Sequence, residues 1–152
     1  SVVMPLFTFL PHLKKSNGSF VIISSLAGLF GVPTASAYCM GKMALTALHQ
    51  SLFAELSTYN VHLGIIYLGF TENDPDKKTL SADGTQIPVP PRIKFIQLSQ
   101  RRTANAILKM IYKRKKQAVL SLTGKLTSML ARLTPSVIHA LAKKSEQKAR
   151  LA

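Results

Sequence analysis

Two short runs of branched apolar residues, separated by one amphipathic helix, limit the fold more than any other feature of the chain. The runs span residues 19–24 (SFVIIS) and 61–68 (VHLGIIYL), and neither alternates apolar with polar residues. Strands of this kind are typically buried on both faces, as in parallel sheets covered by helices. Between them, residues 37–57 repeat leucines at helical spacing. The order strand, helix, strand predicts an α/β fold with a parallel sheet.

The remaining chain supplies further candidate elements. Residues 1–15 indicate the end of an amphipathic helix, residues 97–113 a second helix, and residues 117–122 a third, shorter strand. Residues 123–152 are predicted to be helical in two pieces, broken at Pro135.

The stretch of residues 69–91 is polar and contains Asp74-Pro75 and a Pro-rich end. A long segment without regular structure in a compact domain is usually a lid over a site or a disordered segment. We therefore expect one partial domain over residues 1–122, with residues 69–91 as a substrate lid. Residues 123–152 would form a basic, amphipathic helical extension.

Charge divides the chain into two unequal parts. In residues 1–91, five lysines balance five acidic residues, whereas residues 92–152 hold fifteen Lys and Arg against one acid, Glu146. A basic helical end can be a solvated face that packs on the domain or on a second subunit. It can also lie on an anionic membrane surface. The sequence shows no nucleic-acid recognition motif, so we expect no nucleic-acid partner.

Cysteine and histidine residues give little sign of metal chemistry. Cys39 is the single cysteine, which excludes an internal disulfide and a Cys-based zinc site. The four histidines show no ligand spacing, and we expect no metal site. A reducing compartment fits this composition, and we expect a cytoplasmic protein, with peripheral attachment to a membrane left open.

Tyr38 and Lys42 stand four residues apart at the start of the predicted helix. Side chains at this spacing share one helix face, and an ammonium beside a phenol stabilises the phenolate. Such a tyrosine can give a proton to a substrate oxygen or take one from it. A hydroxyl at the end of the preceding strand, from Ser24 or Ser25, could hold that oxygen in place.

This arrangement resembles the short-chain dehydrogenase/reductase family. The resemblance depends on residues 18–25 (GSFVIISS), Ala27-Gly28, Pro33 and residues 38–42 (YCMGK). It implies the C-terminal half of a doubly wound, Rossmann-like parallel-sheet domain. The family's spacing before the tyrosine selects Ser25 as the catalytic serine. Tyr38 would then be the general acid/base, and Lys42 would support it and bind the nicotinamide ribose.

The resemblance also implies an NAD or NADP cofactor and a carbonyl or alcohol substrate, with hydrophobic substrates and a homo-oligomer as further expectations. Gly69, Thr71 and Asn73 would contact the nicotinamide end of the cofactor. Leu68 stands where the family usually has proline, and Asn73 where it usually has threonine.

The sequence lacks the glycine-rich turn after a first strand that holds the cofactor pyrophosphate in this family. We therefore expect the second half of such an enzyme, neither stable nor active alone. The main alternative is a non-enzymatic remnant of the fold that serves as an interaction or membrane-surface module.

Overall fold

The computed structural model describes residues 2–74, 76–81, 83–89, 97–134, 136–137, 140, 143 and 147. At its centre is a parallel sheet in the order β1-β2-β5, formed by β1 (Ser19–Ser25), β2 (His62–Leu68) and β5 (Gln117–Val119). Ile22 pairs with Ile65 and Ser25 with Leu68, so β1 and β2 end at the same edge of the sheet. The predicted α/β fold with a parallel sheet is confirmed.

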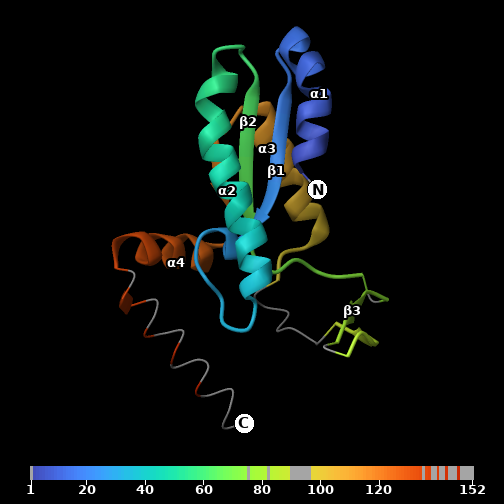
Figure 1. The fold of residues 1–152 in the computed structure, drawn as a ribbon, viewed down its shortest axis with the longest axis vertical. Coiled ribbons are helices and arrows are strands. Elements are labelled where there is room, and N and C mark those ends of the chain that lie inside the picture. Colours follow the sequence, from blue (N-terminus) through green and yellow to red (C-terminus); the bar gives the residue numbers. More distant parts are fainter. Residues whose placement is uncertain are drawn as a thin grey trace.

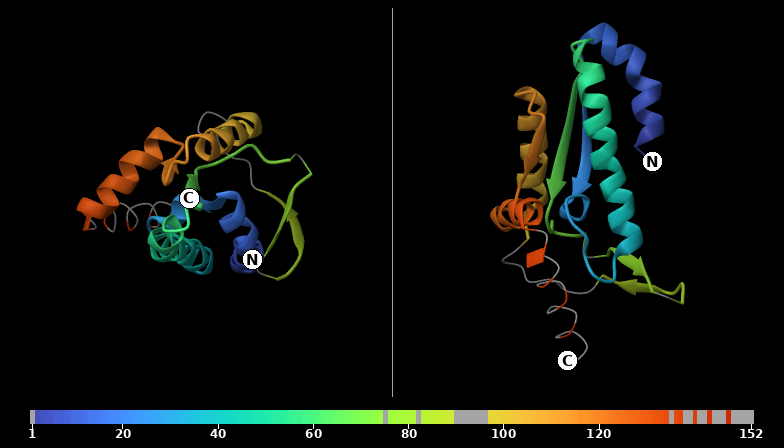
Figure 2. Two further views of the ribbon diagram at one scale, coloured as in Figure 1. Left: turned by 90° about the horizontal axis from the view of Figure 1, so that it is seen from above. Right: turned by 60° about the vertical axis from the view of Figure 1, so that its left-hand side comes forward.

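Helices cover both faces of this sheet. Helices α1 (Val3–Ser16) and α2 (Ser36–Ser57) lie on one face, and α3 (Gln100–Tyr112) lies on the other (Figures 1 and 2). The α2 helix runs beside both β1 and β2. Its predicted bounds differ from the observed ones by one residue, because the leucine spacing marks its length well.

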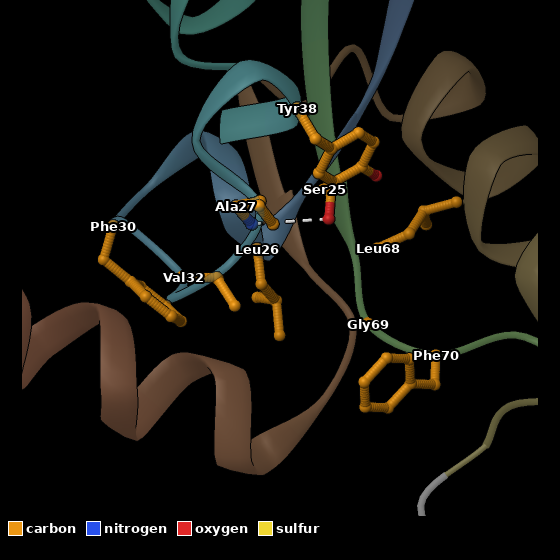
Figure 3. Close-up of a pocket in the computed structure, with 10 residues that line it drawn as sticks. Ser25, Leu26, Ala27, Phe30, Val32, Tyr38, Leu68, Gly69 and Phe70 are labelled. Atoms are coloured by element: carbon orange, nitrogen blue, oxygen red, sulfur yellow. Dashed lines mark hydrogen bonds between the residues drawn. The ribbon is translucent and has the colours of Figure 1, made fainter. Parts of the chain in front are cut away.

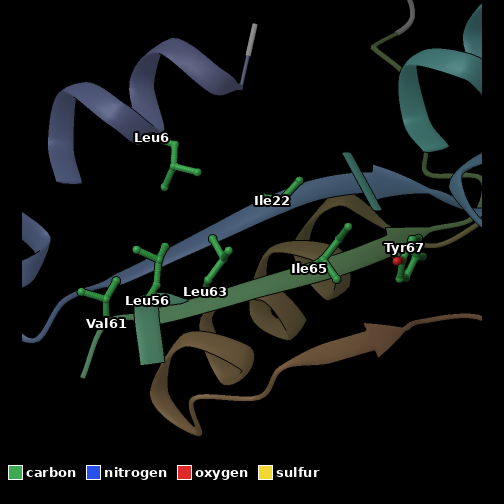
Figure 4. Packing of buried hydrophobic residues seen from close by; sticks show 7 residues of the cluster. All are labelled: Leu6, Ile22, Leu56, Val61, Leu63, Ile65 and Tyr67. Atoms are coloured by element: carbon green, nitrogen blue, oxygen red, sulfur yellow. The ribbon is translucent and has the colours of Figure 1, made fainter. Parts of the chain in front are cut away.

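Burial explains why β2 is the central strand. Residues 62–67 are all buried, whereas β1 is only partly buried and Ile23 is 39% exposed. Apolar residues from α1, α2, β1 and β2 form one core (Figure 4). Its buried members are Leu6, Ile22, Leu56, Val61, Leu63, Ile65 and Tyr67.

The prediction that residues 69–91 lack regular structure is wrong for their middle part. Strands β3 (Lys78–Leu80) and β4 (Gln86–Pro88) pair as an antiparallel hairpin. Its turn contains Gly84 at φ 84°, a conformation that glycine adopts without strain. Asp83 Oδ1 accepts hydrogen bonds from the amide and the hydroxyl of Thr85. Residues 75, 82 and 90–91 lie outside the described residues.

The C-terminal helix α4 (Leu122–Leu133) begins one residue before the predicted boundary, where the Ser121 hydroxyl accepts a hydrogen bond from Gly124 N–H. A β-carbon at Gly124 would lie 2.6 Å from Leu26 Cδ2, so the helix start packs closely on the segment after β1. The second predicted helical piece falls largely outside the described residues. No helix in the described part of the chain is both long and apolar enough to cross a bilayer.

Candidate active site

The two serines at the end of β1 lie in different environments. Ser24 is 2% exposed, and its hydroxyl donates to the Lys42 carbonyl at 3.4 Å. Ser25 is half-buried, and its Oγ accepts from Ala27 N–H at 3.3 Å, which caps the short 3-10 helix η1 (Leu26–Gly28). Successive side chains of a strand point to opposite sides. Ser24 therefore faces α2, whereas Ser25 faces the other way and lines a cavity at the end of β1.

Tyr38 and Lys42 lie on the first turns of α2, as the sequence predicts. The Lys42 ammonium is 5.7 Å from the centroid of the Tyr38 ring, and 52% of Tyr38 is exposed. The same ammonium donates to the carbonyl oxygen of Ile23 at 3.3 Å. Lys42 thus lies beside Tyr38 and is hydrogen-bonded to the backbone of β1.

The Ile23 carbonyl faces away from β2. His62 N–H donates to the Gly18 carbonyl, and backbone groups along a strand alternate between its two sides. Even-numbered residues of β1 therefore bond β2, and odd-numbered residues face the opposite side. Within the described residues β1 pairs with β2 alone, so Lys42 covers a carbonyl on an open sheet edge.

A cavity of about 500 Å³ opens where β1 and β2 end (Figure 3). Ser25 and Tyr38 supply its polar side chains, and Phe30 and Phe70 stand on opposite sides of it. The remainder of the wall is apolar. The full lining is Ser25, Leu26, Ala27, Phe30, Val32, Ala35, Tyr38, Leu68, Gly69 and Phe70.

The residues expected at the nicotinamide are only partly gathered here. Gly69 lines the cavity, whereas Thr71 and Asn73 are not among its lining residues. Thr71 forms a parallel bridge with Leu98, in which Glu72 N–H donates to Leu98 and Leu98 N–H donates to Phe70. The Thr71 N–H therefore faces away from Leu98. The Asn73 side chain accepts from Lys77 Nζ at 3.4 Å.

Seven of the ten lining residues were not among the predicted site residues: Leu26, Ala27, Phe30, Val32, Ala35, Leu68 and Phe70. The largest of them, Phe30 and Phe70, lie outside the helices and strands, where no periodicity indicates which side chains meet. Cys39 has a role near them, because it is 5% exposed and its Sγ accepts from Val32 N–H at 3.3 Å. Cys39 is thus a buried packing residue, and this contact joins α2 to the loop that carries Val32.

His49 and His62 are buried near the starts of β1 and β2, away from the sheet edge where the cavity lies. The ring Nε2 of His49 lies 3.2 Å from the Leu63 carbonyl, and burial lowers the pKa of His49 below its usual 6.5. His62 bridges Ser19 Oγ and the Lys115 carbonyl through its two ring nitrogens. Both act in packing and lie away from the cavity residues.

The chain resembles known proteins in sequence. The sequence profile of the family described as short chain dehydrogenase matches residues 1–83. The chain is 27% identical over 120 residues to dehydrogenase/reductase SDR family member 7B of Danio rerio, covering 79% of this chain and 39% of that protein. It is 35% identical over 81 residues to 11-beta-hydroxysteroid dehydrogenase-like 4A of Arabidopsis thaliana, covering 51% and 27%. The chain thus spans well under half of the curated relatives it matches.

A solved structure shares the fold. A short chain dehydrogenase from Burkholderia cenocepacia, solved in complex with NADP, superposes with a TM-score of 0.71 at 17% identity. The match covers 90% of this chain and 52% of that chain. The described elements therefore form part of a Rossmann-like fold.

Proposed function

Because the chain belongs to the short-chain dehydrogenase family, we propose that the protein containing it transfers hydride between NAD(P)(H) and a carbonyl or alcohol. The observation that carries this proposal is the cavity at the ends of β1 and β2. Its two polar side chains are Ser25 and Tyr38, and Lys42 stands next to the tyrosine ring.

Each of the three side chains has a distinct task in the proposed reaction. Tyr38 gives a proton to the carbonyl oxygen during reduction and takes it back during oxidation. The Lys42 ammonium stabilises the phenolate left after proton transfer. The Ser25 hydroxyl holds the substrate oxygen against Tyr38, and the apolar wall makes both hydrogen bonds stronger than they would be in water.

Part of the local structure fits the nicotinamide end of the cofactor. When bound, NAD(P)(H) supplies or accepts the hydride. Gly69 forms part of the cavity wall without a side chain, and the Thr71 N–H points away from its bridge to Leu98. We assign Thr71 N–H and the Asn73 amide to the carboxamide, and Lys42 to the ribose. The pyrophosphate would depend on a glycine-rich turn that this sequence does not contain, so we propose that residues 1–152 alone have no turnover.

Hydrophobic substrates fit the cavity best. Phe30, Val32 and Phe70 surround the reacting groups with apolar surface, and burying a ligand against such surface is favourable at about 25 cal/mol per Å². The Arabidopsis relative is named for a hydroxysteroid, which supports an apolar carbonyl or alcohol as the substrate class.

A tyrosine exchange in the full-length protein tests the proposal. Tyr38→Phe keeps the ring and removes the hydroxyl, and we expect turnover of apolar ketones with NADH or NADPH to fall about 10²- to 10⁴-fold. Tyr59→Phe is the matched control, because Tyr59 is also 52% exposed and also lies beside a lysine, with Lys14 Nζ 3.4 Å from its ring centroid. Equal turnover in both variants would contradict the proposal and favour a non-enzymatic role.

A further inference from the structure

A second cavity, of about 360 Å³, lies at the other edge of the sheet between α3, β5 and α4. It shares no lining residue with the cavity that holds Tyr38. Three lysines from three different elements line it: Lys109 of α3, Lys115 of the following turn and Lys125 of α4. Its other lining residues are Ala106, Met110, Gln117, Ala118, Val119 and Leu120.

The three lysines have no acidic partner in the described part of the chain. All five acidic residues there belong to the first 91 positions, and the one acid that follows, Glu146, lies outside the described residues. All three side chains are exposed to solvent, and each contributes to the lining of the same cavity. Cationic residues gathered around one cavity, without acidic partners, create a positive potential that attracts an anion.

The edge of β5 adds backbone donors to the lysines. Ile65 N–H donates to the Lys116 carbonyl and Leu120 N–H donates to the Tyr67 carbonyl, so residues 116 and 120 face β2. Because backbone groups alternate along a strand, the N–H groups of Gln117 and Val119 face the opposite side. Within the described residues no further strand pairs there, and these donors point toward the edge where the cavity lies.

Apolar residues complete the lining of the cavity. Met110 is 1% exposed, and Val119 and Leu120 are half-buried. A ligand that contacts these residues loses water on that side, and charge-assisted hydrogen bonds gain strength in such surroundings.

We propose that the cavity between α3, β5 and α4 binds a phosphate-bearing anion through Lys109, Lys115 and Lys125. A phosphate group matches the donors, because it offers several charged oxygens to cations and backbone N–H groups together. Its source is either a soluble phosphoester or the headgroup of an acidic phospholipid. The second source fits the exposed apolar residues of the same two helices, Leu108 on α3 and Leu126 and Met129 on α4, which are 63%, 54% and 56% exposed.

Charge-matched variants of the full-length protein test this site. The site variant carries Lys109→Gln, Lys115→Gln and Lys125→Gln. The control carries Lys15→Gln, Lys78→Gln and Lys113→Gln, which removes the same charge outside the cavity. Calorimetric titration with inorganic pyrophosphate probes soluble phosphate. Flotation with phosphatidylcholine vesicles, with and without phosphatidic acid, probes the headgroup.

We expect the unmodified protein and the control to bind at least one probe, and the site variant to bind it at least about tenfold more weakly. Weaker pyrophosphate binding assigns a soluble phosphoester, and loss of flotation on phosphatidic acid vesicles alone assigns a lipid headgroup. Equal binding by the site variant and the control overturns the proposal, as does binding of neither probe by the unmodified protein. If the site variant unfolds early, the three single Lys→Gln variants replace it, and each must weaken binding.

Discussion

The ammonium of Lys42 donates a hydrogen bond to the backbone carbonyl of Ile23 at 3.3 Å. This bond joins the start of α2 to the outward-facing edge of β1. It also holds the ammonium 5.7 Å from the Tyr38 ring. Because one atom serves both contacts, the sheet itself sets the position of the positive charge beside the phenol.

Removal of this charge should reduce activity far more than stability. In Lys42→Gln the phenolate loses its neighbouring cation, and we expect kcat of the full-length protein to fall about a hundredfold. Lys14→Gln removes a lysine from another Lys–Tyr pair, with Tyr59, outside the cavity. Steady-state kinetics of both variants is the measurement. A kcat for Lys42→Gln within a few-fold of Lys14→Gln would refute the assigned role.

Exchange of the adjacent serines should separate activity from stability. We expect Ser25→Ala to lower kcat about 10²- to 10³-fold, because the substrate oxygen loses a donor in an apolar cavity. Ser24→Ala leaves the cavity untouched but deprives the Lys42 carbonyl of a buried partner, at a cost of about 1 kcal/mol in the free energy of unfolding. The measurements are kcat and the free energy of urea unfolding for both variants. The reverse pattern would assign the substrate contact to Ser24.

Two glycines in the segment after β1 should respond differently to one added methyl group. A β-carbon at Gly28 would lie 2.7 Å from Ser24 Oγ and 2.9 Å from the Lys42 carbonyl oxygen. Gly28→Ala should therefore destabilise the fold by about 1–3 kcal/mol. At Gly31 no described heavy atom comes within 4 Å of the added carbon, so Gly31→Ala should be neutral or slightly stabilising. Equal urea midpoints for the two variants would show that the close packing of η1 on α2 is absent in solution.

Stability should fall as the pH is lowered below about 6.5. Burial is the largest cause that lowers the pKa of His49 in the folded state, so the unfolded chain binds more protons than the folded chain as pH drops through its unfolded value. The contribution is fully present above that value and is lost toward the folded pKa. Urea unfolding across this range should show the loss, and His49→Gln should reduce it. The exposed His12→Gln should not alter it, and an unchanged pH dependence in His49→Gln would exclude His49 as the cause.

The sequence predicts the elements around the cavity well. Residues 19–25, 36–57 and 62–68 were predicted within one residue, because buried apolar runs and leucine spacing are strong local signals. Ser25 and Tyr38 line one cavity, and Lys42 lies beside the tyrosine ring; their chemical roles stay predictions. Their proximity follows from two rules, helical spacing within α2 and the shared edge at which parallel strands end.

Other features needed the structure. The hairpin of β3 and β4 was read as irregular, although Asp83-Gly84 is a turn signal that could have indicated it. Phe30 and Phe70 lie 40 positions apart in loops, and no local pattern brings them to one cavity. The three lysines of the second cavity belong to separate elements, and only the pairing of β5 with β2 brings them together.

The close packing of α4 on Leu26 has a consequence for how ligands affect one another. Leu26 is one of the residues that line the cavity of Tyr38. At the start of α4, Gly124 packs so closely on Leu26 that an added β-carbon would clash with it. The next residue, Lys125, lines the second cavity. A substrate that pushes Leu26 toward Gly124 would therefore press on the start of the helix that carries Lys125. Thermodynamic reciprocity then requires that, by whatever factor an anion in the second cavity changes substrate affinity, the substrate changes anion affinity by the same factor.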